Sequence, residues 1–115
     1  MADVPRRAGP VSVTTLFAAL RLRQADLKDL EDRIRVAEAK QVKLAGRLDD
    51  LRKVILAKLA DPNCSRTIID GLIENRTALR VKLVTVWADL PPEPYKALAE
   101  IKADVKRLVQ ATADA

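Results

Sequence analysis

The sequence predicts an all-α protein, either an extended helical hairpin or an open three-helix bundle with a long, coiled-coil-like first helix. An apolar residue recurs at alternating steps of four and three from Leu16 to Ile55, the spacing of a coiled-coil contact rather than of a broad apolar face. Apolar residues make up 49% of the 115 residues and aromatic residues only 3%, so the apolar content is mostly aliphatic and suits helix–helix packing. No segment shows the alternation of a strand.

The prolines predict where the helices begin and end. Residues 1–13 contain two prolines and are predicted to form an irregular tail. A long helix is predicted over 14–60, with Thr14 or Thr15 as its N-cap and Asp61-Pro62-Asn63 as its stop. We call its heptad positions the seam and expect them to contact a partner helix. The seam residues are Leu16, Leu20, Arg23, Leu27, Leu30, Ile34, Ala37, Gln41, Leu44, Leu48, Leu51, Ile55 and Lys58.

Two shorter helices are predicted after the first, within one structural domain spanning 14–112. Residues 61–90 form a loop and a second helix, which the short loop turns back along the first. Residues 91–115 form a proline-rich turn and a third helix that begins at Pro94, because proline suits the first helical position.

Two layouts remain open for the third helix. It either continues along the first helix, as the return arm of a long hairpin, or folds back into a bundle. In the second layout the leucines from Leu16 to Ile34 would have no partner within the chain, and exposing them would cost about 25 cal/mol per Å². In either layout, another protein chain is expected to take part.

Three polar residues interrupt the seam. Gln41 is a candidate for fixing helix register, because a polar residue among leucines restricts the pairings that a coiled coil accepts; the alternative is that it faces a gap. Arg23 and Lys58 lie near the helix ends, where long side chains are expected to reach water.

The net charge of +5 is concentrated on the first helix, which carries eleven Lys/Arg and seven Asp/Glu over 14–60. Acidic residues interrupt the basic positions and no aromatic residues alternate with them, so nucleic-acid binding is expected to be weak and unspecific. The candidate contacts for a phosphate or an acidic partner are Arg6, Arg7, Arg33, Lys40 and Arg47.

No residue pattern in the chain indicates catalysis. The sequence has no histidine and a single cysteine, Cys64, so a thiol nucleophile would lack the usual base. The adjacent carboxylates Asp49 and Asp50 point about 100° apart on a helix and do not converge on one ligand. There is no glycine-rich phosphate loop and no metal-ligand spacing. We therefore expect no enzymatic activity, no metal and no cofactor.

The predicted function is that of a structural or assembly component, which acts through helix–helix packing in a larger multi-protein complex as a homo- or hetero-oligomer. A bacteriophage particle is the first context we consider, by analogy with the small basic helical proteins of such particles. The alternatives are a basic nucleic-acid-associated protein and a cytosolic adaptor or chaperone that binds a partner helix. No membrane span and no classical secretion signal are expected, so the chain is placed in the cytoplasm or in a particle assembled inside the cell.

Overall fold

The computed structural model describes residues 12–115, which form three α-helices without strands. The all-α class and the open, hairpin-like pairing of helices predicted from the sequence are confirmed. Most of the predicted tail, with Arg6 and Arg7, lies outside the described residues. The helices are α2 (Val13–Ala60), α3 (Arg66–Thr85) and α4 (Pro94–Asp114).

The chain divides into two compact units. The central unit is Arg33–Pro91, which holds the second part of α2 and all of α3. The terminal unit consists of the chain before Arg33, described from residue 12, and Pro92–Ala115, which includes α4. One helix, α2, therefore contributes to both units.

The first helix begins one residue earlier than predicted, at Val13, and its N-cap is Ser12 rather than Thr14 or Thr15. The hydroxyl oxygen of Ser12 accepts a hydrogen bond from the backbone N–H of Thr15 at 3.1 Å. That bond satisfies one of the N–H groups that a helix leaves without a partner in its first turn. The backbone carbonyl of Ser12 also accepts from the N–H of Leu16, at 3.0 Å.

Polar side chains close the loop between α2 and α3. The carboxylate of Asp61 accepts from the backbone N–H of Asn63 at 2.9 Å, forming an Asx turn after the helix ends. Ser65 has an extended backbone, and its hydroxyl accepts from the N–H of Ile68 at 3.4 Å, which caps α3. The chain thus reverses direction over residues 61–65.

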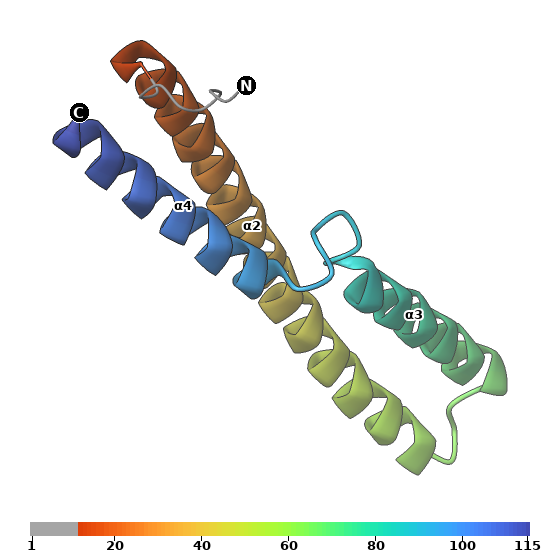
Figure 1. The fold of residues 1–115 in the computed structure, drawn as a ribbon. Coiled ribbons are helices and arrows are strands. Elements are labelled where there is room, and N and C mark those ends of the chain that lie inside the picture. The colour runs from red at the N-terminus through yellow and green to blue at the C-terminus, as the bar shows by residue number, and fades with distance from the viewer. Residues whose placement is uncertain (1–11) are drawn as a thin grey trace. The chain divides into compact units, whose positions relative to one another are not determined.

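In the central unit, α3 runs antiparallel beside the second part of α2 (Figure 1). The indole N–H of Trp87, just beyond the end of α3, donates to the side-chain oxygen of Gln41 at 3.0 Å. The α-helix itself ends at Thr85, and hydrogen-bonded turns carry the chain on to Leu90. Pro91 and Pro92 therefore follow a region that has already left the helix.

In the terminal unit, α4 begins at Pro94 and runs antiparallel beside the first part of α2 (Figure 1). The guanidinium of Arg23 on α2 lies 3.0 Å from the carboxylate of Asp104 on α4. Of the two layouts left open by the sequence, the terminal unit has the hairpin-like one, in which the third helix packs along the first. The leucines of this unit from Leu16 to Leu30 thus lie beside a helix of their own chain.

The buried core of the described residues is small and consists only of seam positions. Neither α3 nor α4 contributes a buried residue, because each packs on α2 from one side only. The other apolar seam residues of α2 are half-buried. No described helix has both the length and the hydropathy that crossing a membrane requires. The five buried residues are Leu20, Leu30, Ile34, Ala37 and Ile55.

Candidate functional site

The seam is covered within the chain, by α4 in the terminal unit and by α3 in the central unit. Each of its apolar side chains is buried or half-buried, and only Gln41 and Lys58 among its members are exposed. The partner helices for which the seam is suited are therefore supplied here by the protein itself. Whether the half-buried seam positions also contact another chain stays a prediction.

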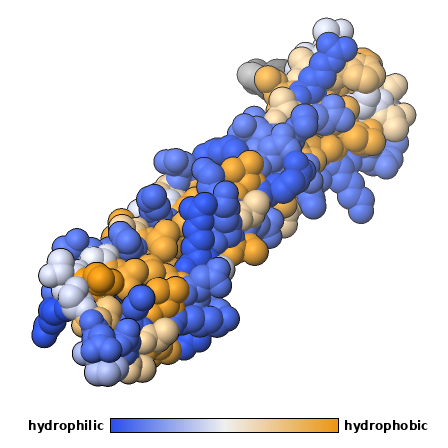
Figure 2. Space-filling model, turned by 180° about the vertical axis from the view of Figure 1, so that it is seen from behind, coloured by the Kyte–Doolittle hydropathy of each residue, from blue (hydrophilic) through white to orange (hydrophobic). Residues whose placement is uncertain are grey.

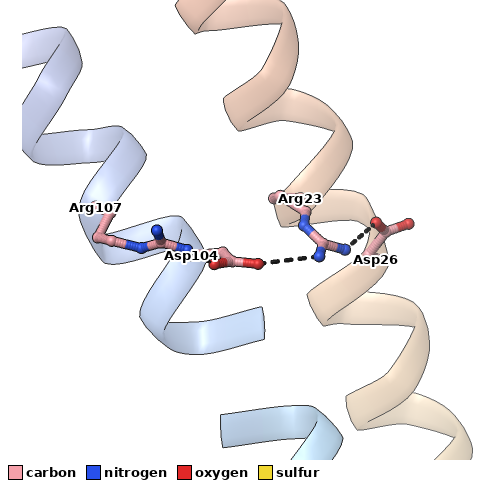
Figure 3. A network of polar contacts seen from close by, with 4 residues as sticks. All are labelled: Arg23, Asp26, Asp104 and Arg107. Carbon is pink, nitrogen blue, oxygen red and sulfur yellow. Dashed lines mark hydrogen bonds and ion pairs between the residues drawn. The ribbon is translucent and has the colours of Figure 1, made fainter. Parts of the chain in front are cut away.

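Arg23, whose side chain is 40% exposed, also joins the two helices of the terminal unit, which the sequence did not predict. Its guanidinium lies 2.9 Å from the carboxylate of Asp26 on its own helix and 3.0 Å from that of Asp104 on α4. Arg107 contacts the same Asp104 carboxylate (Figure 3). The side chain of Asp104 is only 24% exposed, so this pair is better shielded from solvent than a surface ion pair.

The polar interruption at Gln41 is likewise matched within the chain, by the indole of Trp87. Close by in sequence, the guanidinium of Arg33 donates to the backbone carbonyl oxygen of Asp89. Both bonds join the first turns of α2 in the central unit to the segment that follows α3. The register role considered for Gln41 in a coiled coil stays a prediction, because Trp87 lies beyond the end of α3.

The residues predicted to contact a phosphate lie in different surroundings. Lys40 and Arg47 line one pocket of about 410 Å³, together with Lys43 and with Lys82 from α3. We call this group the lysine-rich pocket. Arg33 does not line it and is engaged with Asp89. Arg6 and Arg7 lie outside the described residues.

A second basic pocket in the central unit was not identified from the sequence. Its volume is about 300 Å³, and we call it the arginine pocket. The sequence signal was present, because Arg76 occupies a heptad position of the second helix and Arg80 follows one turn later. Heptad spacing does not tell what lies opposite these two residues, and α2 supplies a third arginine there. The lining residues are Leu48, Asp49, Arg52, Arg76 and Arg80.

The single carboxylate of the arginine pocket is already engaged. Asp49 lies 3.2 Å from the ammonium of Lys53 and 3.2 Å from the guanidinium of Arg52. Hydrogen bonds from Lys53 and then Arg52 hold the pKa of the Asp49 carboxyl below its usual value. Asp49 is therefore a stable anion that neutralises cations of its own helix.

Arg76 has the least satisfied side chain of the pocket. Its Nε–H is buried and donates to no acceptor among the described residues. Leaving a buried donor unpaired costs about 1–3 kcal/mol, and most buried polar groups in folded proteins have a partner. The two basic pockets thus differ, since the cations of the lysine-rich pocket are exposed to solvent whereas the arginine pocket contains an unsatisfied buried donor.

Metal-ligating side chains do not cluster in the part of the chain that the structure describes. The described residues contain no group of three or more His, Cys, Asp or Glu side chains placed to hold a metal ion. Cys64 is half-buried in the loop before α3, and its thiol lies 3.7 Å from the backbone carbonyl oxygen of Ser65. The distinctive chemistry of this surface is its concentration of cations.

Comparisons of the chain with protein-family models, with curated proteins and with solved structures find no match.

Proposed function

We propose that this protein is a structural or assembly component that acts through helix–helix packing in a larger multi-protein complex. The observation that carries the proposal is the thinness of each unit. Two helices in a single layer bury only seam residues of α2, and none of α3 or α4. Since stable domains generally pack at least two layers around a core, a further helix or sheet from a partner would complete such a unit.

The hairpin tip is the contact surface that we favour, and we define it as Leu56, Leu59 and Ile68. These side chains are 54%, 58% and 52% exposed, at the end of α2 and the start of α3. Hydrophobic surface is visible at this end of the central unit, towards the lower left of Figure 2. Apolar side chains grouped on a surface are typical of protein interfaces, whereas single ones are ordinary.

The test is purification of the tagged full-length protein from its native source, with identification of stoichiometric partners by mass spectrometry. The wild type should co-purify in a particle much larger than itself, and Leu59→Ser/Ile68→Ser should weaken that association. Val42→Ser/Val84→Ser is the matched control, because both side chains are apolar and exposed, at 74% and 77%, but lie on α2 and α3 away from the hairpin tip. A free monomer without stoichiometric partners would refute the proposal.

The identity of the partner separates the narrower versions of this function. Recovery with capsid or tail proteins would support a bacteriophage particle, which we place first by analogy with small basic helical proteins of such particles. Recovery with one folded client would support an adaptor or chaperone. A parallel homodimer through the seam is disfavoured, because Arg47 would face Arg52 and the seam is covered by α3 and α4.

Nucleic-acid association is the second candidate, and the lysine-rich pocket is the observation that favours it. Lys40, Lys43, Arg47 and Lys82 are all exposed, and none makes an ion pair within residues 12–115. Such cations would neutralise phosphates without reading bases, so binding should be unspecific and fall steeply with salt. Lys40→Glu/Lys43→Glu/Arg47→Glu should abolish it in a fluorescence-anisotropy titration with duplex DNA. Tight, sequence-selective binding at physiological salt would make this candidate the better one.

A further inference from the structure

We propose that the arginine pocket of the central unit binds a phosphate group. This site is separate from the lysine-rich pocket, with which it shares no lining residue. It also does not depend on the assembly function, because it concerns a ligand held between α2 and α3 rather than a partner packed on the hairpin tip.

The pocket holds more positive charge than its own residues balance. Arg76 and Arg80 stand one helical turn apart on α3, and like charges at that spacing repel each other. Arg52 brings a third guanidinium from α2, and Asp49 is the only carboxylate in the lining. The lining therefore carries a formal excess of +2, even before Lys53, which also pairs with Asp49, is counted. An anion between the guanidiniums would relieve this repulsion.

Hydrogen bonding points to the same place. The Nε–H of Arg76 is buried without an acceptor, and Arg80 makes no ion pair with any described residue. Guanidinium groups donate in a planar fork that fits two oxygens of one anion at once. An oxyanion in the pocket would supply acceptors to Arg76 and Arg80 while Arg52 keeps its contact with Asp49.

A phosphate group fits the pocket better than a carboxylate does. It carries about −1.5 to −2 charges near neutral pH and offers at least three acceptor oxygens, whereas a carboxylate carries one charge on two oxygens. No aromatic residue lines the pocket, so a base would find no stacking partner. Recognition would be confined to the phosphate, whether it is free or belongs to a nucleic-acid backbone.

The experiment is a calorimetric titration of the full-length protein with inorganic phosphate, at neutral pH and at an ionic strength held constant with sodium chloride. Arg76→Leu and Arg80→Gln should each weaken binding about tenfold or more, as expected for lost hydrogen bonds between charged groups. Arg66→Gln is the matched control, because Arg66 lies on the same helix but is 89% exposed and pairs with Asp70. It should change the affinity less than twofold.

A second titration, with a short single-stranded oligonucleotide that lacks terminal phosphates, distinguishes the two sources. Binding of phosphate with this pattern supports a free phosphate group as the ligand. If only the oligonucleotide binds, and the Arg76 and Arg80 variants bind it more weakly while the Arg66 variant does not, the ligand is a phosphate of a nucleic-acid backbone. The proposal is overturned if neither binds, if all three substitutions weaken binding equally, or if a glutamate-rich peptide binds more tightly than both. Circular dichroism should show that each variant is folded. Because Arg80 is exposed, Arg80→Gln is the variant expected to disturb the fold least.

Discussion

The two units use the same helix in opposite electrostatic ways. The described part of the terminal unit has seven Lys/Arg and eight Asp/Glu, whereas the central unit has twelve and seven, a formal charge of +5. Both contain an arginine at a heptad position. In the terminal unit, Arg23 forms an ion pair with Asp104 on the facing helix. In the central unit, Arg76 lines a pocket together with two more arginines. A heptad pattern thus sets where helices touch, while the facing residue decides whether a polar side chain at such a position is paired or left without an acceptor.

The largest effect should come from charging the buried seam. Leu30 is 4% exposed, so Leu30→Asp should destabilise the protein by about 3–5 kcal/mol, the cost of an uncompensated buried charge. Leu44→Asp, at a half-buried seam position of the central unit, should cost less. Urea unfolding followed by circular dichroism measures both. The exposed control Gln24→Asp should change the free energy of unfolding by no more than about 0.5 kcal/mol. If it lowers that free energy as much as Leu30→Asp does, the seam is misassigned.

Replacing Asp104, the acidic partner of Arg23 on α4, tests whether this ion pair stabilises the terminal unit. Asp104→Leu should lower the free energy of unfolding by about 1–2 kcal/mol, because Arg23 keeps its partial burial but loses its acceptor on α4. Arg23→Leu/Asp104→Leu should recover most of that loss, since an apolar pair often replaces a shielded ion pair without cost. A double-mutant cycle in urea gives the coupling. Strictly additive losses would mean that the two side chains do not act as a pair.

The corresponding change in the central unit should have the opposite sign. Arg76→Leu removes an unsatisfied buried donor and one of three clustered charges, so we expect a gain of about 0.5–1 kcal/mol in unfolding free energy. Arg23→Leu, the matched change in the terminal unit, should instead destabilise, because it leaves the half-buried Asp104 with one partner fewer. Thermal unfolding in a buffer free of phosphate is the measurement. If both substitutions shift the melting temperature in the same direction, the contrast between the units fails.

The smallest effect concerns the pH dependence of Asp49. Its pKa in the folded state lies below the usual value of 3.8, so its ion pairs contribute stability at pH values above that figure. This contribution is lost as the pH falls through the lowered pKa. Lys53→Gln should raise the pKa of Asp49 more than Arg52→Gln does, because the hydrogen bond from Lys53 is the larger cause. A carboxyl-detected NMR titration can follow the shift, with Lys58→Gln as a silent control.

Part of the candidate site could be predicted from the sequence, and the reason for the rest is geometric. Lys40 and Arg47 were recognised because they share one flank of a helix, and both line the lysine-rich pocket. Lys82 could not be assigned to the same place, because its position depends on how α3 is aligned along α2. The N-cap was misassigned to Thr14 or Thr15, since all three hydroxyl residues suit a cap and only the backbone shows which one precedes the helix.

The all-α class and the heptad positions that supply the buried core could be predicted from local sequence patterns alone. Aliphatic spacing and proline placement are local properties, and each acts through the chain's own helical geometry. The tertiary structure decided which residue faces each polar heptad position, pairing Arg23 with Asp104 and Gln41 with Trp87 while leaving Arg76 without an acceptor. The physical reason is that pairing depends on the alignment of two helices, and a shift of one helical turn, about 5.4 Å, would exchange every partner without altering either helix.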